Sequence, residues 1–408
     1  MKIGRPRLVE RDRKLEYRVD VESLEGASEL WFGVAEEHGD LVSDRADAAV
    51  LALLLPAMQA GEDLYVEGPV SEKLHYGLSG LFQAVMQHLV PALRPVRIHA
   101  AEIGPATGWA QGVATGFSAG IDSFSVLADH HYGTPSAGYR LTHLLYNNVG
   151  SHGDTGNPLF RLRYERLRPA VERIGLPFVA VDSNLMAFYK SLAFKDTYTL
   201  RNVVVALLLQ AGIGRSFHAA GTVVSGPPPT LPLHDIAHLD AVVLPMVSTE
   251  ALDAQWVGGN YTRVEKTLQV AEIEDSYDVL DVCVRNDRAG NCSTCKKCVR
   301  VVLTLEIAGF LDRYAAVFDF DAYRKDRHWR VARILRKKLA FSMEIKLLAR
   351  ERGYQFPLRE RLIALTRLDA VRDWVVGLAA RTRGGHRWLQ RRKARRSPLY
   401  RPGSRTSP

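Results

Sequence analysis

The stretch Gly116-Phe-Ser-Ala-Gly-Ile-Asp-Ser-Phe124 decides the fold that we expect for this chain. Before it, the apolar residues 113–116 predict a strand, and after it the apolar spacing predicts an amphipathic helix through residue 129. A turn of small residues in this context lets successive backbone N–H groups converge on an anion, and the start of the helix adds partial positive charge. Ser118 and Ser123 add hydroxyl donors. We therefore predict an anion-binding loop; an ordinary serine-rich helix cap is the alternative.

Asp122 suggests that a cation accompanies the anion at this loop. A carboxylate alone would repel a triphosphate, so its presence suggests a Mg²⁺ ion that bridges carboxylate and phosphate. A Walker-type loop does not fit, because no Gly-Lys-Ser/Thr follows. The methyl group of Ala119 is tolerable if the backbone there keeps a negative φ. The residues of the predicted anion-binding loop are Ser118, Ala119, Gly120, Ile121, Asp122 and Ser123.

Beyond the loop, strand and helix patterns alternate. Further strands are expected at 141–146, 177–181, 217–221 and 241–247, and helices at 158–174 and 199–210. Such alternation predicts an α/β fold with a doubly wound parallel sheet, whose ligands bind beyond the carboxyl ends of the strands. Polar residues that follow two of these strands are weaker site candidates, since turn formation explains them as well; they are Asn147, Asn148, His152, Asp154, Asp182 and Asn184.

The chain is long enough for two or three domains. Residues 1–108 predict a separate α+β domain, with strands at 15–22, 29–36, 63–67 and 96–100 and helices at 46–58 and 72–89. We expect residues 109–310 to form the α/β domain, 311–380 a helical extension and 381–408 a disordered basic tail.

The net charge of +9 is concentrated in this tail, which has ten Lys or Arg residues and no Asp or Glu. Without it, 44 basic residues face 45 acidic ones, so the rest of the chain is nearly neutral. A solvated tail is the ordinary interpretation, and weak contact with RNA or anionic lipid is the alternative. No apolar run approaches the length of a membrane span, and no secretory signal is visible at the N-terminus. The expected location is the cytoplasm.

All four cysteines lie in one window with the spacing C-x8-C-x2-C-x2-C: Cys283, Cys292, Cys295 and Cys298. In a cytosolic chain with no other cysteines this cluster predicts a metal site rather than disulfides. Thiolates two residues apart on a tight turn can share one tetrahedral ion, and four of them leave no open position, so zinc would be structural. An iron–sulfur cluster and redox-active cysteines are the alternatives.

Residues 118–123 resemble the Ser-Gly-Gly-x-Asp-Ser signature of the PP-loop ATP pyrophosphatases, with Ala119 in place of a glycine. Together with the cysteine spacing they resemble the 7-cyano-7-deazaguanine synthases in particular, over about residues 112–305. Arg201-Asn202 and the segment 262–266 are further similarities. The Tyr-Pro-Asp-Cys segment that contributes to that family's substrate pocket has no counterpart after Gly221.

This resemblance implies an ATP-dependent ligase or amidating enzyme with a PP-loop fold. A carboxylic acid and ATP would give an acyl-adenylate and pyrophosphate, and ammonia or another amine would then displace AMP. Asp122, Ser123 and Arg201 are the expected catalytic residues, with Mg²⁺ at Asp122 and Asn202 contacting nucleotide or substrate. The alternatives are a surface ion pair for Arg201 and a helix-end role for Asn202.

Two other function classes stay open from the sequence. One is a PP-loop enzyme that modifies tRNA, which the basic tail and the arginine-rich segments after residue 323 favour. The other is a PP-loop fold that binds nucleotide without catalysis. The acyl substrate and the nitrogen donor are not identified by any motif.

Overall fold

The computed structural model describes the chain except for residues 153–157, 222, 224–234, 284–289, 372–373 and 375–408. The chain divides into two compact units, Met1–Asp319 and Phe320–Pro408. Over the described ranges, none of the helices combines the length and the apolar character that a membrane crossing requires.

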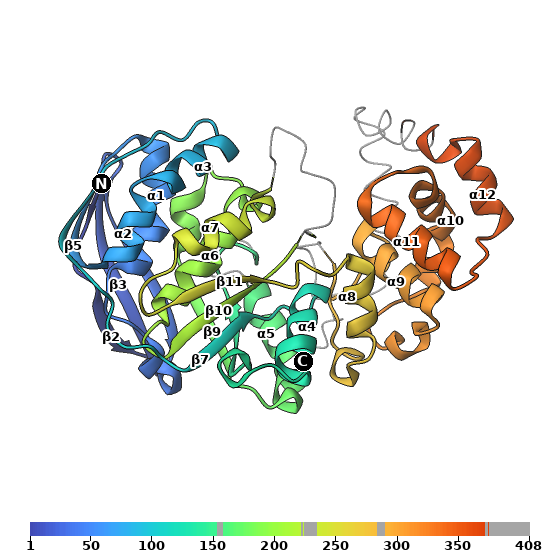
Figure 1. The fold of residues 1–408 in the computed structure, drawn as a ribbon, viewed down its shortest axis with the longest axis horizontal. Helices are drawn as coiled ribbons and strands as arrows, with labels where there is room; N and C mark the ends of the chain where they lie inside the picture. The colour runs from blue at the N-terminus through green and yellow to red at the C-terminus, as the bar shows by residue number, and fades with distance from the viewer. Residues whose placement is uncertain (153–157, 222, 224–234, 284–289, 372–373, 375–408) are drawn as a thin grey trace, which may run out of the picture. The chain divides into compact units, whose positions relative to one another are not determined.

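One sheet of eleven strands runs through the first unit (Figure 1). Its order is β11-β10-β7-β8-β9-β4-β3-β1-β5-β6, and β2 pairs with β3. The strands are β1 Lys2–Ile3, β2 Arg7–Arg11, β3 Lys14–Ser23, β4 Gly26–Ala35, β5 Leu64–Ser71, β6 Ile98–Gly104, β7 Gly112–Gly116, β8 His143–Asn147, β9 Phe178–Ser183, β10 Ile213–Ala219 and β11 Asp253–Val257.

The five strands β7 to β11 are parallel and stand in the order β9-β8-β7-β10-β11. Right-handed crossovers therefore place the helices after β7 and β8 on one face and those after β9 and β10 on the other. Figure 1 shows α4 and α5 on one side of these strands, and α6 and α7 on the other. The order reverses between β7 and β10, and a crevice for a ligand is expected at the carboxyl ends there.

Nine α-helices are described in the first unit. They are α1 Asp47–Ala60, α2 Glu72–Leu78, α3 Leu81–Leu89, α4 Ile121–Leu127, α5 Pro158–Ile174, α6 Phe194–Leu208, α7 Asp240–Met246, α8 Arg263–Val270 and α9 Lys296–Ala308. Helix α1 is apolar on all sides and almost wholly buried, as expected for a helix enclosed by other elements.

The expected strand at 241–247 is wrong, because these residues form α7. Asp240 lies in the first turn of the helix, and Val243, Leu244 and Val247 are buried on one side while Val242 is exposed. An apolar run this short does not distinguish a strand from a helix by its periodicity. The fifth parallel strand is β11 instead, which the sequence pattern did not indicate.

The N-terminal region is not a separate domain. Strand β4 pairs antiparallel with β9, with Phe32 opposite Ser183 and Gly33 opposite Asp182, so the N-terminal strands extend the parallel sheet. Asn184 reinforces the junction, because its side chain accepts from the Trp31 N–H at 2.9 Å and donates to the Glu29 carbonyl at 2.7 Å. The expected boundary at residue 108 therefore falls inside one compact unit.

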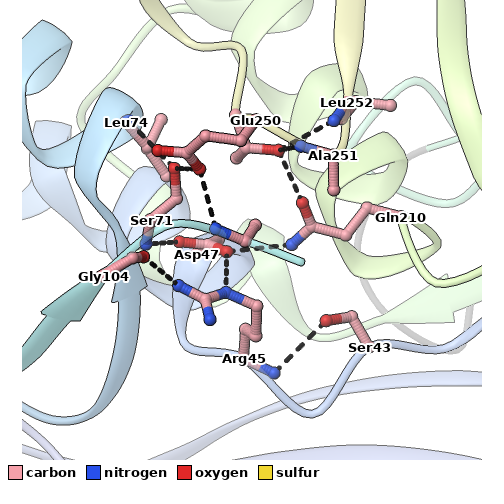
Figure 2. Close-up of polar contacts among 12 residues, drawn as sticks. Ser43, Arg45, Asp47, Ser71, Leu74, Gly104, Gln210, Glu250, Ala251 and Leu252 are labelled. Atoms are coloured by element: carbon pink, nitrogen blue, oxygen red, sulfur yellow. Dashed lines mark hydrogen bonds and ion pairs between the residues drawn. The ribbon is translucent and has the colours of Figure 1, made fainter. Parts of the chain in front are cut away.

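A buried polar network also joins the N-terminal helices to the parallel part of the sheet (Figure 2). The carboxylate of Asp47, which is fully buried, accepts from the Ser71 N–H at 2.6 Å, from Gln210 at 2.9 Å and from Arg45 at 2.9 Å. Glu250 accepts from the Ser71 hydroxyl at 2.6 Å. Because buried polar groups are costly when left unpaired, this network fixes how the two halves meet.

The described part of the second unit is helical, with α10 Phe320–Arg336, α11 Ala340–Glu351 and α12 Leu358–Leu365. Two almost fully buried carboxylates pair with arginines of α10: Glu360 with Arg327 at 2.9 Å, and Asp369 with Arg336 at 2.7 Å. The unit begins at Phe320 rather than at residue 311, because 311–319 belong to the first unit.

The unit boundary also changes how the charge is distributed. Residues 320–408 contain 25 Lys or Arg and 7 Asp or Glu, a net charge of +18. The remaining 29 basic and 38 acidic residues give residues 1–319 a net charge of −9. The near-neutral charge that remains without the tail is thus the sum of −9 for residues 1–319 and +8 for residues 320–380.

Candidate functional site

The loop 117–120 lies at the carboxyl end of β7, beside the point where the strand order reverses. Phe117 is buried against Phe124 and Phe178, and its N–H bonds to the Leu145 carbonyl at 2.8 Å, which anchors the loop to β8. The loop therefore has a fixed base and an exposed crest at Ser118.

The backbone N–H groups of Ser118, Ala119 and Gly120 form no hydrogen bond with any residue that the structure describes. Gly120 is the N-cap of α4 and provides no side-chain cap, so the serine-cap alternative does not describe this loop. Three successive donors without partners are what an anion-binding turn offers.

Ala119 does not keep the negative φ that we expected. Its φ is 54°, in the left-handed region, and its side chain is fully buried. This conformation costs a residue with a Cβ about 1 kcal/mol or more. A strained loop persists only where its surroundings hold it, and here the Ala119 carbonyl accepts a hydrogen bond from the Asp281 N–H at 2.8 Å.

Ile121 and Ser123 support the loop from inside. Ile121 is buried, and the Ser123 hydroxyl donates to the Gly120 carbonyl at 3.0 Å, which closes the first turn of α4. Of the six predicted loop residues, Ser118 is exposed and the side chain of Asp122 is 35% exposed, whereas Ala119, Ile121 and Ser123 are buried.

Asp122 is bound by two cations from α8. Arg263 Nη1 donates to Asp122 Oδ1 at 2.6 Å, and Lys266 Nζ lies 3.6 Å from the same oxygen. Lys266 is 3% exposed, its ammonium donates to the Ala220 carbonyl at 2.7 Å, and burial lowers its pKa. Oδ2 of Asp122 forms no hydrogen bond with the described residues, so this oxygen is available to a metal ion.

Helix α8 is placed by a capping box. The Thr262 hydroxyl accepts from the Glu265 N–H at 3.1 Å, and the Glu265 carboxylate accepts from the Thr262 N–H at 2.7 Å. Arg263 and Lys266 are three residues apart, so both project from the same side of the helix toward α4, against which α8 packs.

A second titratable group of residues lies at the end of β10. Phe217 pairs with Thr115 of β7, which places His218 beside the start of the loop. His218 Nε2 lies 3.6 Å from Asp240 Oδ2, and Thr199 donates to Asp240 Oδ1 at 2.7 Å. Burial lowers the pKa of His218 to about 4 and raises the pKa of Asp240 to about 7, so the imidazole is neutral at pH 7.

Arg201 is not at the crest of the loop, and it is not a surface residue either. It is fully buried, its guanidinium stacks 4.2 Å from the Tyr189 ring centroid, and burial lowers its pKa. It donates to the Val149 and Leu192 carbonyls, each at 3.2 Å, and to the Thr197 hydroxyl at 2.8 Å. With its donors directed at protein carbonyls, Arg201 is a positioning residue for the chain after β8.

Asn202 and Asn147 meet at the carboxyl end of β8. The Asn147 amide donates to Asn202 Oδ1 at 2.9 Å, and Asn202 donates to the Tyr198 carbonyl. Asn147 Oδ1 and the Tyr146 hydroxyl are buried with no hydrogen-bond partner among the described residues. Unpaired buried polar atoms at a binding edge are suited to a ligand.

The other polar candidates serve the fold. Asn148 donates to Asp182 at 2.7 Å, which ties β8 to β9, and Asn184 joins β9 to β4 as described above. His152 packs on Tyr146, and burial lowers its pKa to about 4. Asp154 lies outside the described residues.

The four cysteines converge as predicted. Their Sγ atoms all lie within 4.8 Å of one another, with Cys295 and Cys298 3.5 Å apart and Cys292 and Cys298 4.0 Å apart. Four thiolates around one tetrahedral zinc, with Zn–S bonds of about 2.3 Å, would lie roughly 3.8 Å apart. The group is therefore positioned to hold one metal ion and is compatible with zinc. Backbone N–H groups of Cys295 and Cys298 point at the thiolates of Cys292 and Cys295, as around a bound metal.

The sequence singled out the segment 262–266 only as a similarity and gave no role to Arg263 or Lys266, and it did not indicate His218 or Asp240 at all. The signal for the first two was present, because the Thr262–Glu265 capping box fixes the start of α8 and hence the side on which both cations lie. No local pattern pointed to His218 and Asp240, which only the pairing of β10 with β7 and the packing of α7 bring together.

Comparisons with family models, with curated proteins and with solved structures gave no match to this chain.

Proposed function

We propose that this chain is a ligase of the ATP pyrophosphatase type, which joins a carboxylic acid to a nitrogen nucleophile through an acyl-adenylate. The observation that carries the proposal is the loop 118–120, with three successive free N–H groups at the switch point of a parallel sheet, next to an aspartate that two cations flank. This site unites anion donors with two cations, and Asp122, whose Oδ1 is paired with both, keeps its other oxygen for a Mg²⁺ ion beside the phosphates.

In this proposal the β- and γ-phosphates of ATP accept from the N–H groups of 118–120 and from the Ser118 hydroxyl. Arg263 and Lys266 neutralise the charge that develops on the departing pyrophosphate. Asp122 Oδ2 would hold Mg²⁺, which supplies further charge neutralisation between the carboxylate and the phosphates. Asn147 and Tyr146, with unpaired buried atoms at the end of β8, would contact the rest of the nucleotide or the acyl substrate.

The chemistry needs no protein nucleophile. A carboxylate oxygen of the substrate attacks the α-phosphorus, the bond to the bridging oxygen breaks, and pyrophosphate leaves with the electron pair. The nitrogen lone pair then attacks the acyl carbon, the bond to the AMP oxygen breaks, and the nitrogen loses one proton. Water accepts that proton, because a histidine whose pKa burial lowers to about 4 is a weak base at pH 7. Positioning and charge stabilisation supply most of the rate.

Zinc in the four-cysteine site would be structural, because four thiolates close its coordination sphere. Its contribution would be to fold the segment that contains Asp281, whose backbone holds Ala119. No step of the reaction involves this metal.

A second candidate is a PP-loop enzyme that acts on tRNA, and the net charge of +18 on residues 320–408 favours it. This candidate keeps the same nucleotide site and changes the acceptor to an RNA base. It predicts tRNA binding that weakens steeply with salt and that is lost when residues 381–408 are removed.

The test is exchange of labelled pyrophosphate into ATP across a library of carboxylic acids, with Mg²⁺ and the zinc-loaded full chain. Asp122→Asn is compared with Asp12→Asn, a matched control in an exposed turn where φ is 49° and asparagine is favoured. We expect at least one acid to support exchange, and Asp122→Asn to lower it by about a hundredfold. If exchange is unchanged in Asp122→Asn, the site assignment is wrong. If the protein binds ATP but no acid supports exchange, the non-catalytic alternative is favoured.

A further inference from the structure

Asp281 links the proposed phosphate loop, residues 117–120, to the four-cysteine site. Its backbone N–H donates to the Ala119 carbonyl at 2.8 Å. Its carboxylate accepts from the Cys283 N–H at 3.1 Å, and from the Gly290 N–H and Arg166 Nη1, each at 3.0 Å. Asp281 therefore contacts Ala119, the strained residue of the loop, and both ends of the segment that leads from Cys283 to Cys292.

In the phosphate loop, this link ends at Ala119, whose backbone conformation is strained and needs support. Ala119 has a φ of 54°, and its orientation determines where the free N–H groups of Ala119 and Gly120 point. A hydrogen bond from Asp281 contributes about as much as a left-handed alanine costs. Without this bond the loop would populate other conformations in which the N–H groups diverge.

At the other end of this link, the four cysteines that would bind the metal hold the segment together. Cys283 is one ligand, and Gly290, with a φ of 96°, turns the chain toward Cys292. Asn291, directly before Cys292, accepts from the Val282 N–H at 2.9 Å and donates to the Leu280 carbonyl at 2.7 Å. Leu280 and Val282, the two neighbours of Asp281, are thus both hydrogen-bonded to Asn291, the residue before Cys292.

Arg166 is the other group that holds the Asp281 carboxylate, and it comes from α5 rather than from the cysteine segment. It contributes one of the three hydrogen bonds to that carboxylate. The other two come from backbone groups whose separation depends on whether Cys283 and Cys292 are held together.

We propose that Asp281 is a positioning residue through which occupation of the four-cysteine site sets the conformation of the phosphate loop, so that metal and nucleotide bind cooperatively. The identity of the ligand as a nucleoside triphosphate rests on the proposed function. By thermodynamic reciprocity, the factor by which zinc raises nucleotide affinity equals the factor by which nucleotide raises zinc affinity.

The experiment measures binding rather than turnover. The dissociation constant of Mg²⁺ with α,β-methylene ATP, which cannot be cleaved at the proposed position, is determined by calorimetry for the zinc-loaded full chain, for Asp281→Asn and for Asp278→Asn. Asp278 is a matched control three residues before Asp281, half-exposed and paired with Arg173 on the surface. We expect Asp281→Asn to weaken nucleotide binding by about fivefold or more, and Asp278→Asn to bind like the wild type.

A cobalt-substituted sample shows whether the metal site survives, because thiolate-to-cobalt absorption reports four-sulfur coordination. We expect an unchanged spectrum in Asp281→Asn. A second measurement uses the wild type alone: the affinity for zinc, by competition with a chelator, with and without the ATP analogue. The ATP analogue is expected to raise the affinity for zinc by the same factor by which zinc raises the affinity for the analogue.

The outcomes separate the two proposals. If the wild type binds no nucleotide, the proposed function fails and this inference fails with it. If the wild type binds nucleotide but the analogue leaves zinc affinity unchanged, the coupling alone is overturned, whatever the stability of the variant. Wild-type nucleotide affinity in a zinc-loaded Asp281→Asn protein would overturn the role of Asp281.

Discussion

Arg263 donates to the carboxylate of Asp122 at 2.6 Å, although 141 positions separate them in the chain. This contact joins the start of α8 to the first turn of α4 and brings a cation to the loop 118–120. Lys266 follows one turn later and is almost fully buried. A buried ammonium is costly unless it is paired. Its presence at this position is therefore best explained by the anionic groups that it faces.

The two cations are expected to support nucleotide binding. Arg263→Gln and Lys266→Met should each weaken binding of Mg²⁺ and ATP by roughly tenfold or more, because a charge-assisted hydrogen bond is worth about 1.5–3 kcal/mol. Calorimetric titration measures this effect. Arg168→Gln, which removes an exposed cation paired with Glu172 on α5, is the control and should bind like the wild type. If all three variants bound Mg²⁺ and ATP as tightly as the wild type, α8 would not be part of the nucleotide site.

The backbone conformation at Ala119 makes a prediction about two opposite substitutions. Ala119→Gly should change the free energy of unfolding by no more than about 1 kcal/mol, since relief of the left-handed conformation offsets the lost methyl burial. Ala119→Val should destabilise the protein by about 2 kcal/mol or more, because a β-branched residue strongly disfavours this φ. Urea unfolding measures both. A valine variant as stable as the wild type would contradict the observed φ of 54°.

Arg201 is expected to act on stability rather than on binding. Arg201→Met leaves the Val149 and Leu192 carbonyls without their donor, and each unpaired buried group costs about 1–3 kcal/mol. We expect a lower midpoint of urea unfolding, with nucleotide affinity of the folded protein within about twofold of wild type. A large loss of affinity at unchanged stability would instead restore the direct role that the family resemblance implied.

The stability of the junction in Figure 2 should depend on pH through Glu250. Burial opposes ionisation, but hydrogen bonds from the Ser71 hydroxyl and from the Ala106 and Lys73 N–H groups outweigh it and lower the pKa of Glu250 to about 2. A lowered pKa stabilises the folded state above the ordinary pKa of 4.5, and this contribution is lost as pH falls from 4.5 toward 2. Glu250→Gln should therefore be less stable at pH 7 and should show a flatter dependence over that interval. Parallel curves for variant and wild type would show that Glu250 is not responsible.

The features that the sequence predicted well are local ones. The loop at 116–124 lies between strand and helix signals, and the four cysteines specify their site by spacing, so neither depends on distant residues. The pairing of β4 with β9 joins Phe32 to Ser183 across the chain, and no local pattern announces it. The same limit hid the contact between Arg263 and Asp122. The run 241–247 was misassigned as a strand because one side of it is buried and the other is not. Which side is buried depends on the elements that pack against it, and the local sequence does not specify them.

Arg201 illustrates a different limit. An arginine next to an asparagine at a resembling position predicted a catalytic role at the phosphates or the substrate carboxylate, but the structure directs its donors at protein groups. Tyr189 and two backbone carbonyls enclose the guanidinium. Sequence similarity identifies which residue is present, whereas burial decides what it can reach.

The most direct test of the central claim is the identity of the products that the chain makes from ATP. Phosphorus NMR of a reaction that contains Mg²⁺, ammonia, the zinc-loaded protein and a carboxylic acid active in pyrophosphate exchange follows both phosphate products at once. We expect equal amounts of AMP and pyrophosphate, and about a hundredfold less of both with Asp122→Asn. ADP and inorganic phosphate would contradict it, because they would place the cleaved bond between the β- and γ-phosphates instead.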